Sequence, residues 1–411
     1  MNISNRLHKF TLLSSLYVSQ YIPLMFLVQA LPVFMRQQGA SLESLGLFYL
    51  LGLPLLLKVF WSPFIDRYGF TRWGHYRFWI VCFQLLLAGT AMLCAFVDIQ
   101  TDLTLLFGLL MIMAIFSASQ DIATDALAVG LLTLEERGWG NGIQMAGNYC
   151  GSILGGGAML VLLNQLQWTN SLLLLALMVI IALVPILQHR EQYFKSGAIH
   201  SPWLSVFNFY RRPGIWRWLL ILTVYLVGGS MVNGMFRPLL VDAGLTLSEI
   251  GWLLGVVGNG AAIVGAVVSG LLTVPWGRKR SLLLFGALQA IAILFYLLPA
   301  SGRTDWLTLY SVTIFFHLAM GAIFTVSSTV MMDLSQLETA GTDYTAQTSI
   351  IYLGSFAAAA LSGFIASAIG YQGLFWVSSL IVLFSLILIA KLFQSTQFMS
   401  TGNHLNQESY G

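Results

Sequence analysis

About twelve apolar segments follow one another between Phe10 and Phe393, and each is long enough to cross a bilayer. A helix needs roughly 20 apolar residues to span a hydrocarbon core of about 30 Å. Hydrophobic residues make up 57% of the chain and charged residues only 9%, whereas soluble domains carry about 25% charged residues. Because a helix satisfies its own backbone hydrogen bonds in lipid, we predict an all-α polytopic membrane protein.

Short polar connections divide the apolar sequence into twelve expected transmembrane helices. We place these at 10–34, 44–65, 78–97, 103–132, 142–164, 169–187, 216–240, 250–274, 281–300, 306–333, 344–368 and 371–393. The longest polar connection, 188–215, follows the sixth helix. It predicts two six-helix bundles, 1–187 and 216–393, followed by a polar tail at 394–411.

Basic residues concentrate in alternate loops, which is the positive-inside pattern of membrane proteins. The loops after the second, sixth and eighth spans are basic, and so is the segment before the first span. We therefore expect both termini and the tail to be cytoplasmic. The formal charge of +3 follows from this placement. Nucleic-acid binding is disfavoured because the basic residues do not gather on one face.

The second half of the chain repeats features of the first. A shift of 208 residues places Gly69 on Gly277 and Asp125 on Asp333, and a shift of 205 places Gly39 on Gly244. Repeats of this kind are expected in transporters whose two halves are related by an axis along the membrane normal.

A polar loop after the second span carries the sequence from Ser62 to Gly69, followed by Arg72. It resembles the loop signature of the major facilitators, in which an Asp-Arg pair, glycines and further basic residues tie helix ends together in one gating state. The resemblance and the repeat predict a cytoplasmic gating latch. Its members are Asp66, Arg67, Gly69, Arg72, Asp125, Asp333, Arg278 and Arg280.

Charged residues inside the expected spans are candidates for coupling. A carboxylate at membrane depth costs about 3 kcal/mol, so it requires a partner or water. Lys58 in the second span is the natural partner of Asp121 in the fourth. This pair could stay closed, or it could open when a proton or substrate arrives. His317 in the tenth span is a further titratable candidate, with a satisfied buried histidine as the alternative.

Polar and aromatic residues recur in the first, fifth, seventh and eleventh spans, which we expect to line a central cavity. The candidates are Tyr17, Gln20, Tyr21, Gln144, Asn148, Asn233, Arg237, Gln347 and Tyr352. Arg237 could hold an anionic ligand or extend to the interface. Each of the others could instead hold helices together. Gly147, Gly151 and Gly155 recur every four residues, which predicts close helix packing.

The strings from Lys58 to Tyr68 and from Ser117 to Ala126 resemble the muropeptide permease and acetyl-coenzyme A transporter branch of the major facilitators. The length and the segment from Ala340 to Gln347 look more like the bacterial siderophore permeases of the rhizobactin and pyochelin type. This resemblance implies a monomeric transporter of the bacterial inner membrane that imports a ferric siderophore by proton symport.

Three other functions stay open. Muropeptide uptake is the nearest alternative within transport, and export of a small molecule is another. A magnesium-dependent prenyltransferase would need a second acidic cluster besides Asp121 and Asp125. The chain has no GxxxxGK[ST] loop, so we do not expect ATP to drive transport directly, and its three cysteines stand apart from histidines, which disfavours a metal site. We expect no enzyme activity, no cofactor and no metal site.

Overall fold

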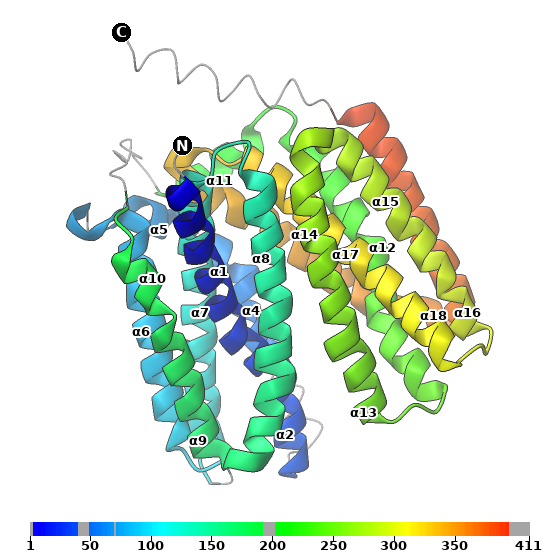
Figure 1. The fold of residues 1–411 in the computed structure, drawn as a ribbon, viewed down its shortest axis with the longest axis horizontal. Helices are drawn as coiled ribbons and strands as arrows, with labels where there is room; N and C mark the ends of the chain where they lie inside the picture. The colour runs from blue at the N-terminus through cyan, green and yellow to red at the C-terminus, as the bar shows by residue number, and fades with distance from the viewer. Residues whose placement is uncertain (1–2, 40–48, 70, 100, 192–201, 394–411) are drawn as a thin grey trace. The chain divides into compact units, whose positions relative to one another are not determined.

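The computed structural model describes residues 3–39, 49–69, 71–99, 101–191 and 202–393 (Figure 1). Three parts of the predicted topology lie outside the described residues. They are the beginning of the second span, part of the connection 188–215, and the tail from residue 394. The structure is almost wholly helical in the part that it describes.

The helices of the described residues are compatible with the twelve predicted membrane crossings. Nine helical segments of the described chain are long and apolar enough to cross a membrane. Two of them turn back on themselves, at Gln167 in Arg137–Gln188 and at Gly370 in Leu337–Leu392, where the backbone leaves the helical region. These two turns give eleven segments of membrane-crossing length, and the shorter apolar helix Leu50–Phe60 belongs to the predicted second span, whose beginning lies outside the described residues. The predicted membrane fold is confirmed.

The chain divides into two compact units. Unit 1 comprises 1–131, 147–206 and 337–345, and unit 2 comprises 132–146, 207–336 and 346–411. The helices of the first half are α1 (Ile3–Met25), η1 (Phe26–Ala30), α2 (Leu31–Gln37), η2 (Tyr49–Gly52), α4 (Leu53–Leu57), η3 (Lys58–Phe60), α5 (Ser62–Arg67), η4 (Thr71–Trp73), α6 (His75–Ala95), α7 (Leu103–Leu131), α8 (Arg137–Gly151), η5 (Ser152–Ala158), α9 (Met159–Ile181) and α10 (Leu183–Gln188).

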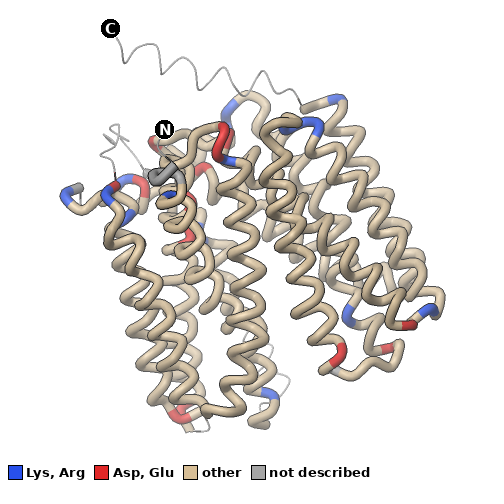
Figure 2. The backbone as a smooth tube through the Cα atoms, in the orientation of Figure 1, with Lys and Arg blue, Asp and Glu red and all other residues tan. Residues whose placement is uncertain are grey.

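The second half has the same kind of helices after the connecting helix α11 (Pro202–Arg211). They are α12 (Ile215–Asp242), α13 (Leu247–Ile250), η6 (Gly251–Gly258), α14 (Asn259–Trp276), α15 (Arg278–Phe295), α16 (Leu297–Ala300), α17 (Trp306–Asp333), η7 (Leu337–Thr339) and α18 (Ala340–Leu392). Figure 2 shows that charged residues lie mostly near the helix ends, with long stretches that carry no charged residue between them.

Each unit has its own apolar core. In unit 1, a cluster around Phe26, Phe34 and Trp168 fills one end, and a second cluster around Ile65 and Ile122 lies at the other. In unit 2, the core surrounds Tyr296, whose ring packs edge-on against several other aromatic rings. Because lipid is as apolar as these cores, close packing rather than hydrophobicity holds such helices together.

Glycines supply this close packing. A Cβ on Gly155 would collide with the Ile22 carbonyl of α1, and one on Gly147 would lie 2.8 Å from the Cβ of Tyr17. In unit 2, Gly265 of α14 lies against the Leu318 carbonyl of α17. The predicted packing role of the Gly147, Gly151 and Gly155 series is therefore confirmed.

Two short segments are exchanged between the halves of the sequence. Residues 132–146 belong to unit 2, although they precede the last two helices of the first half. There, Gly138 and Gly142 approach Gly270 of α14 closely. Residues 337–345 belong to unit 1 in the same way. The fifth and eleventh transmembrane helices thus each begin in one unit and continue in the other.

Residues with positive φ give the register of the repeat. Three pairs share this conformation, namely Gly39 with Gly244 (φ 91° and 86°), Gly74 with Gly277 (95° and 85°), and Gln167 with Gly370 (63° and 72°). The first pair is separated by 205 residues, as predicted, and the other two by 203. Helices α7 and α17, which begin at 103 and 306, are also 203 residues apart.

The predicted shift of 208 residues is therefore wrong. With a shift of 203, Asp125 corresponds to Ser328 and Asp333 to Gly130, so the two aspartates are not counterparts. Short identities recur readily in sequences dominated by alanine, glycine and leucine, whereas turns with positive φ mark structural positions. Asp121 corresponds to Phe324, so the acidic residues of α7 have no acidic counterparts in α17.

Candidate functional site

A buried ion pair lies inside unit 1. The Lys58 ammonium group pairs with an Asp121 carboxylate oxygen, as predicted, and the Gln20 side-chain amide donates to the other oxygen. Lys58 is 1% exposed and Asp121 6% exposed. Lys58 opens the 3-10 turn η3 between α4 and α5, both of which begin with proline in their first turn. This break in the second span directs the lysine toward α1 and α7.

Asp125 lies one turn beyond Asp121 on α7 and is also buried. The Tyr17 hydroxyl of α1 donates to its Oδ1 at 3.2 Å, and Lys58 interacts with it electrostatically. Lys58, Asp121 and Asp125, together with Tyr17 and Gln20, form what we call the α7 cluster. The predicted role of Asp125 in a latch stays a prediction.

Asp66 holds the beginning of α18. Its carboxylate accepts hydrogen bonds from the backbone N–H groups of Gly341 (3.0 Å) and Thr342 (2.7 Å). The Thr342 hydroxyl (2.6 Å) and the Tyr76 hydroxyl (2.9 Å) also donate to it. A carboxylate at a helix N-terminus satisfies unpaired N–H groups and complements the helix dipole. Burial raises the pKa of the Asp66 carboxyl, and these hydrogen bonds partly oppose the rise.

Asp333 forms ion pairs with two arginines in unit 2. The Arg278 Nε donates to its Oδ2 at 2.8 Å, and an Arg137 terminal nitrogen donates to its Oδ1 at 3.1 Å. Arg278 also donates to the Leu134 carbonyl at 2.9 Å, and Arg137 donates to the Met332 carbonyl at 2.9 Å. These contacts fasten the exchanged segment 132–146 to the end of α17.

The other predicted latch residues make different contacts. The Arg67 guanidinium lies 5.5 Å from the centre of the Tyr68 ring, and Arg72 and Arg280 are exposed. Gly69 lies against His75, whose ring would collide with a Cβ there. The role of these residues in gating stays a prediction.

The candidate cavity residues are divided between the units. Tyr17, Gln20, Tyr21 and Asn148 belong to unit 1, and Gln144, Asn233, Arg237, Gln347 and Tyr352 belong to unit 2. Gln347 accepts from the Trp218 indole at 2.8 Å, whereas Asn233 and Arg237 are exposed. His317 of unit 2 is half-buried and its Nδ1 lies 2.8 Å from the Thr313 carbonyl of its own helix.

Sequence reasoning missed two anchoring residues. Arg137 reads from the sequence only as part of a basic loop. Glu191, just after α10, accepts hydrogen bonds from the N–H groups of Tyr76 (3.1 Å) and Arg77 (2.8 Å) at the beginning of α6. Burial raises the pKa of Glu191. The sequence signal that could have indicated this role of Glu191 is an acidic residue at the beginning of the otherwise basic connection 188–215.

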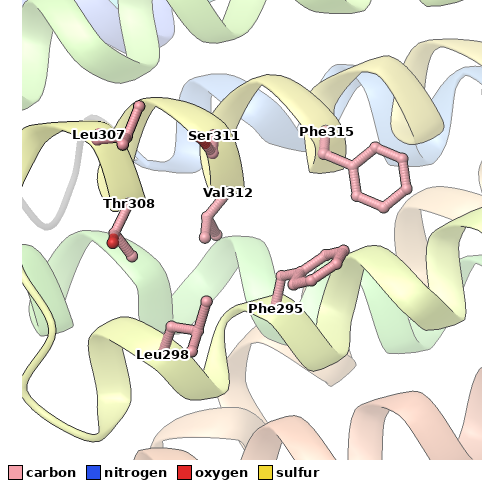
Figure 3. A pocket seen from close by; sticks show the side chains of 7 residues that line it. All are labelled: Phe295, Leu298, Leu307, Thr308, Ser311, Val312 and Phe315. Atoms are coloured by element: carbon pink, nitrogen blue, oxygen red, sulfur yellow. The ribbon is translucent and has the colours of Figure 1, made fainter.

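A shallow pocket of about 370 Å³ lies in unit 2 between α15, α16 and α17 (Figure 3). Its lining is mostly apolar and consists of Phe295, Leu298, Leu307, Thr308, Ser311, Val312 and Phe315. It shares no residue with the predicted cavity, so we do not include it in the candidate site. Among the described residues, no group of three or more His, Cys, Asp or Glu side chains could hold a metal ion.

Comparison with known proteins gives one consistent result. The anhydromuropeptide permease of Escherichia coli K12 is 26% identical over 404 residues, which cover 95% of this chain and 81% of the permease. A putative transporter AmpG 4 of Rickettsia conorii is 23% identical over 387 residues, covering 90% of this chain and 93% of that protein. The resemblance to siderophore permeases gains no support from these relatives.

Solved structures share the fold. The human organic anion transporter MFSD10 (TETRAN) superposes with a TM-score of 0.73 at 14% identity, covering 94% of this chain and all of that chain. The transporter FucP in its outward conformation superposes with a TM-score of 0.69 at 14% identity, covering 94% of this chain and 99% of that chain. The Major Facilitator Superfamily model matches residues 13–241 and 220–407, and the chain therefore belongs to the Major Facilitator Superfamily of membrane transporters.

Proposed function

We propose that the chain imports muropeptides, which are amino sugars carrying a short peptide, across the bacterial inner membrane. The similarity to the anhydromuropeptide permease over 95% of the chain supports this substrate class more directly than it supports a siderophore. The polar, carboxylate-bearing character of a muropeptide also suits a protein with an exposed arginine, Arg237, in a membrane-crossing helix.

The observation that carries the mechanism is the α7 cluster. An ion pair buried in membrane helices is costly to maintain, and charges in such positions usually serve transport. We propose that opening of the Lys58–Asp121 pair couples proton entry to substrate import. His317 remains a second candidate for coupling.

Transport by alternating access requires contacts that hold one state and break in the other. The beginning of α18 and the segment 132–146 before α8 are both held by such contacts. Asp66 holds the beginning of α18, and Asp333 with Arg278 holds the segment before α8. We propose that these contacts form the cytoplasmic latch, with both termini on the same side of the membrane, and that they break once in each transport cycle. Arg137 joins the predicted latch residues in this proposal.

Uptake measurements test the substrate. We would express the chain in cells that lack a muropeptide permease and follow a radiolabelled anhydromuropeptide, with and without a protonophore. A ferric siderophore and the Asp121→Asn variant are run in parallel. We expect protonophore-sensitive muropeptide accumulation that the variant loses. Accumulation of the siderophore instead would restore the siderophore prediction, and movement out of the cell would indicate an exporter.

A further inference from the structure

The pocket of unit 2 has no role in the proposed function. One wall is α17, and the other is the end of α15 together with α16 (Figure 3). Along α17 the pocket extends from Leu307 to Phe315, which corresponds to about 12 Å. The rings of Phe295 and Phe315 meet edge to face at one end, with centroids 5.5 Å apart, and Val312 is buried at the base. The volume of about 370 Å³ suits a small-molecule ligand.

The pocket opens toward lipid. Leu284, Ile291 and Phe295 are exposed along one face of α15, and Leu307 and Ile314 are exposed along one face of α17. Exposed apolar side chains at helical spacing in a membrane-crossing helix form a lipid-facing surface. Phe295 and Leu307 belong both to these surfaces and to the lining of the pocket. A ligand can therefore enter the pocket from the bilayer.

The turn between α16 and α17 places the other end of the pocket at the membrane surface. The Leu298 carbonyl, in the pocket wall, accepts a hydrogen bond from the backbone N–H of Arg303 in this turn at 3.1 Å. At the beginning of α17, the rings of Trp306 and Tyr310 pack together with centroids 5.6 Å apart. Tryptophan and tyrosine concentrate at the level of lipid head groups. The pocket thus runs from the head-group level toward the hydrocarbon core.

One polar group inside the pocket has no partner in the chain. Among the described residues, nothing forms a hydrogen bond with the Ser311 hydroxyl. Elsewhere in α17, the hydroxyls of Thr325 and Thr329 donate to the carbonyl four residues earlier, at 2.9 and 2.8 Å. A polar group that faces lipid is costly unless it is paired. Ser311 lies just below the head-group level, where phospholipids carry their ester carbonyls.

The mouth of the pocket carries one charge of each sign. Arg303 and Asp305 are both exposed in the turn. Asp305 accepts hydrogen bonds from the backbone N–H (3.0 Å) and the hydroxyl (2.8 Å) of Thr308, which also lines the pocket. An arginine beside an aspartate complements a head group that has both a phosphate and an ammonium group. A head group with only negative charge would meet the Asp305 carboxylate.

We propose that this pocket binds one phosphatidylethanolamine molecule from the adjacent leaflet. One acyl chain lies between α15 and α17 and ends against Phe295 and Phe315. The Ser311 hydroxyl donates to an ester carbonyl of the lipid. The phosphate contacts Arg303, and the ammonium group contacts Asp305. This lipid site goes beyond the proposed transport function and does not depend on the transported substrate.

Native mass spectrometry tests the site. The purified full-length protein is equilibrated in detergent with equal amounts of phosphatidylethanolamine and phosphatidylglycerol that have the same acyl chains. We expect the wild type to retain one phosphatidylethanolamine. Ser311→Trp should lose this lipid, because the indole ring fills the pocket. The matched control Leu284→Trp adds the same ring to the lipid-facing surface of α15 outside the pocket, and it should bind lipid as the wild type does.

The head-group contacts predict two further results. Asp305→Asn keeps a residue that can cap α17 but removes the negative charge, so the preference should shift from phosphatidylethanolamine to phosphatidylglycerol. Arg303→Gln should weaken the binding of both lipids, whereas Lys391→Gln removes an exposed positive charge elsewhere in unit 2 and should change neither. A wild type that prefers phosphatidylglycerol, or an unchanged preference in Asp305→Asn, would overturn the head-group assignment. Equal loss of lipid in Ser311→Trp and Leu284→Trp would overturn the pocket.

A second measurement uses only the wild type, in case Ser311→Trp does not fold. Phosphatidylethanolamine with a photoreactive diazirine on one acyl chain is cross-linked to the protein, and the labelled peptides are mapped. We expect label on Phe295, Leu298 and the segment 307–315. Label spread evenly along the exposed face of α15, including Leu284, would contradict a specific site. Absence of muropeptide uptake would leave both measurements unaffected.

Discussion

Gln167 and Gly370 have the same rare backbone conformation, with φ/ψ of 63°/178° and 72°/172°, at equivalent turns of the two halves. This region is populated almost only by glycine, and another residue there costs about 1–3 kcal/mol. The second half therefore has the residue that the turn favours, and the first half does not.

Exchange of these residues predicts opposite effects on stability. Gln167→Gly should stabilise the protein by about 1–3 kcal/mol, since it removes the backbone strain. Gly370→Gln should destabilise it by a similar amount. Thermal unfolding in detergent, followed by circular dichroism, measures both. If neither variant changes the unfolding temperature, the turn conformation does not limit stability.

The buried ion pair predicts a double-mutant effect. Lys58→Met should cost about 3–5 kcal/mol, because it leaves the Asp121 carboxylate without its buried cation. The double variant Lys58→Met with Asp121→Asn should recover part of that loss, and neither variant should accumulate substrate. The free energies of unfolding of the two single variants and the double variant give the coupling. If the change in the free energy of unfolding of the double variant equals the sum of the changes in the two single variants, the two side chains do not interact directly.

Asp66 predicts a pH dependence of stability. Its pKa is raised in the folded protein, so the folded state binds the proton more tightly than the unfolded state. This tighter proton binding stabilises the folded state. The stabilisation is fully present below the ordinary aspartate pKa and is lost as the pH rises through the raised pKa of Asp66. Asp66→Asn should be less stable at every pH, since an amide cannot replace all its acceptor contacts.

The stability that Asp66→Asn loses relative to the wild type should depend on pH, because only the wild type carries the titrating carboxyl group. The difference in unfolding temperature between the wild type and Asp66→Asn should therefore narrow as the pH rises through this window. A gap that widens with pH would show that the hydrogen bonds from Gly341 and Thr342 outweigh burial.

Glycine packing in unit 2 offers a matched pair of variants. Gly265→Ala would place a methyl group against the Leu318 carbonyl and force α14 away from α17, at a cost of about 1–3 kcal/mol. Gly260→Ala, in the same helix, meets open space and should stabilise the helix by about 0.5–1 kcal/mol. Unfolding temperatures that fall equally in both variants would exclude the close approach as the cause.

The membrane fold was predictable because hydropathy and helix length determine it. The boundaries near Gln167 and Gly370 were also close, since polar residues interrupt the apolar segments there. The Lys58–Asp121 pair was predictable because an intramembrane lysine needs a carboxylate at the same depth. The anchoring of α18 by Asp66 was not predictable from the sequence, because it depends on backbone N–H groups, which every residue except proline has.

The repeat register failed for a different reason. Sequence identity aligned Asp125 with Asp333, but φ angles and helix starts place Ser328 opposite Asp125. Backbone geometry is preserved at turns when side chains diverge, and it is invisible to a comparison of letters. The substrate class could not be derived from residues at all, because a fold carries many substrates.

The exchanged segments bear on how such a chain can arise. A protein with a single six-helix repeat would have to donate its 132–146 segment to a second copy and receive the same segment in return, as a swapped dimer does. Gene fusion would convert that reciprocal exchange into one within a single chain. The two copies could then differ, and here only the first has Lys58, Asp121 and Asp125.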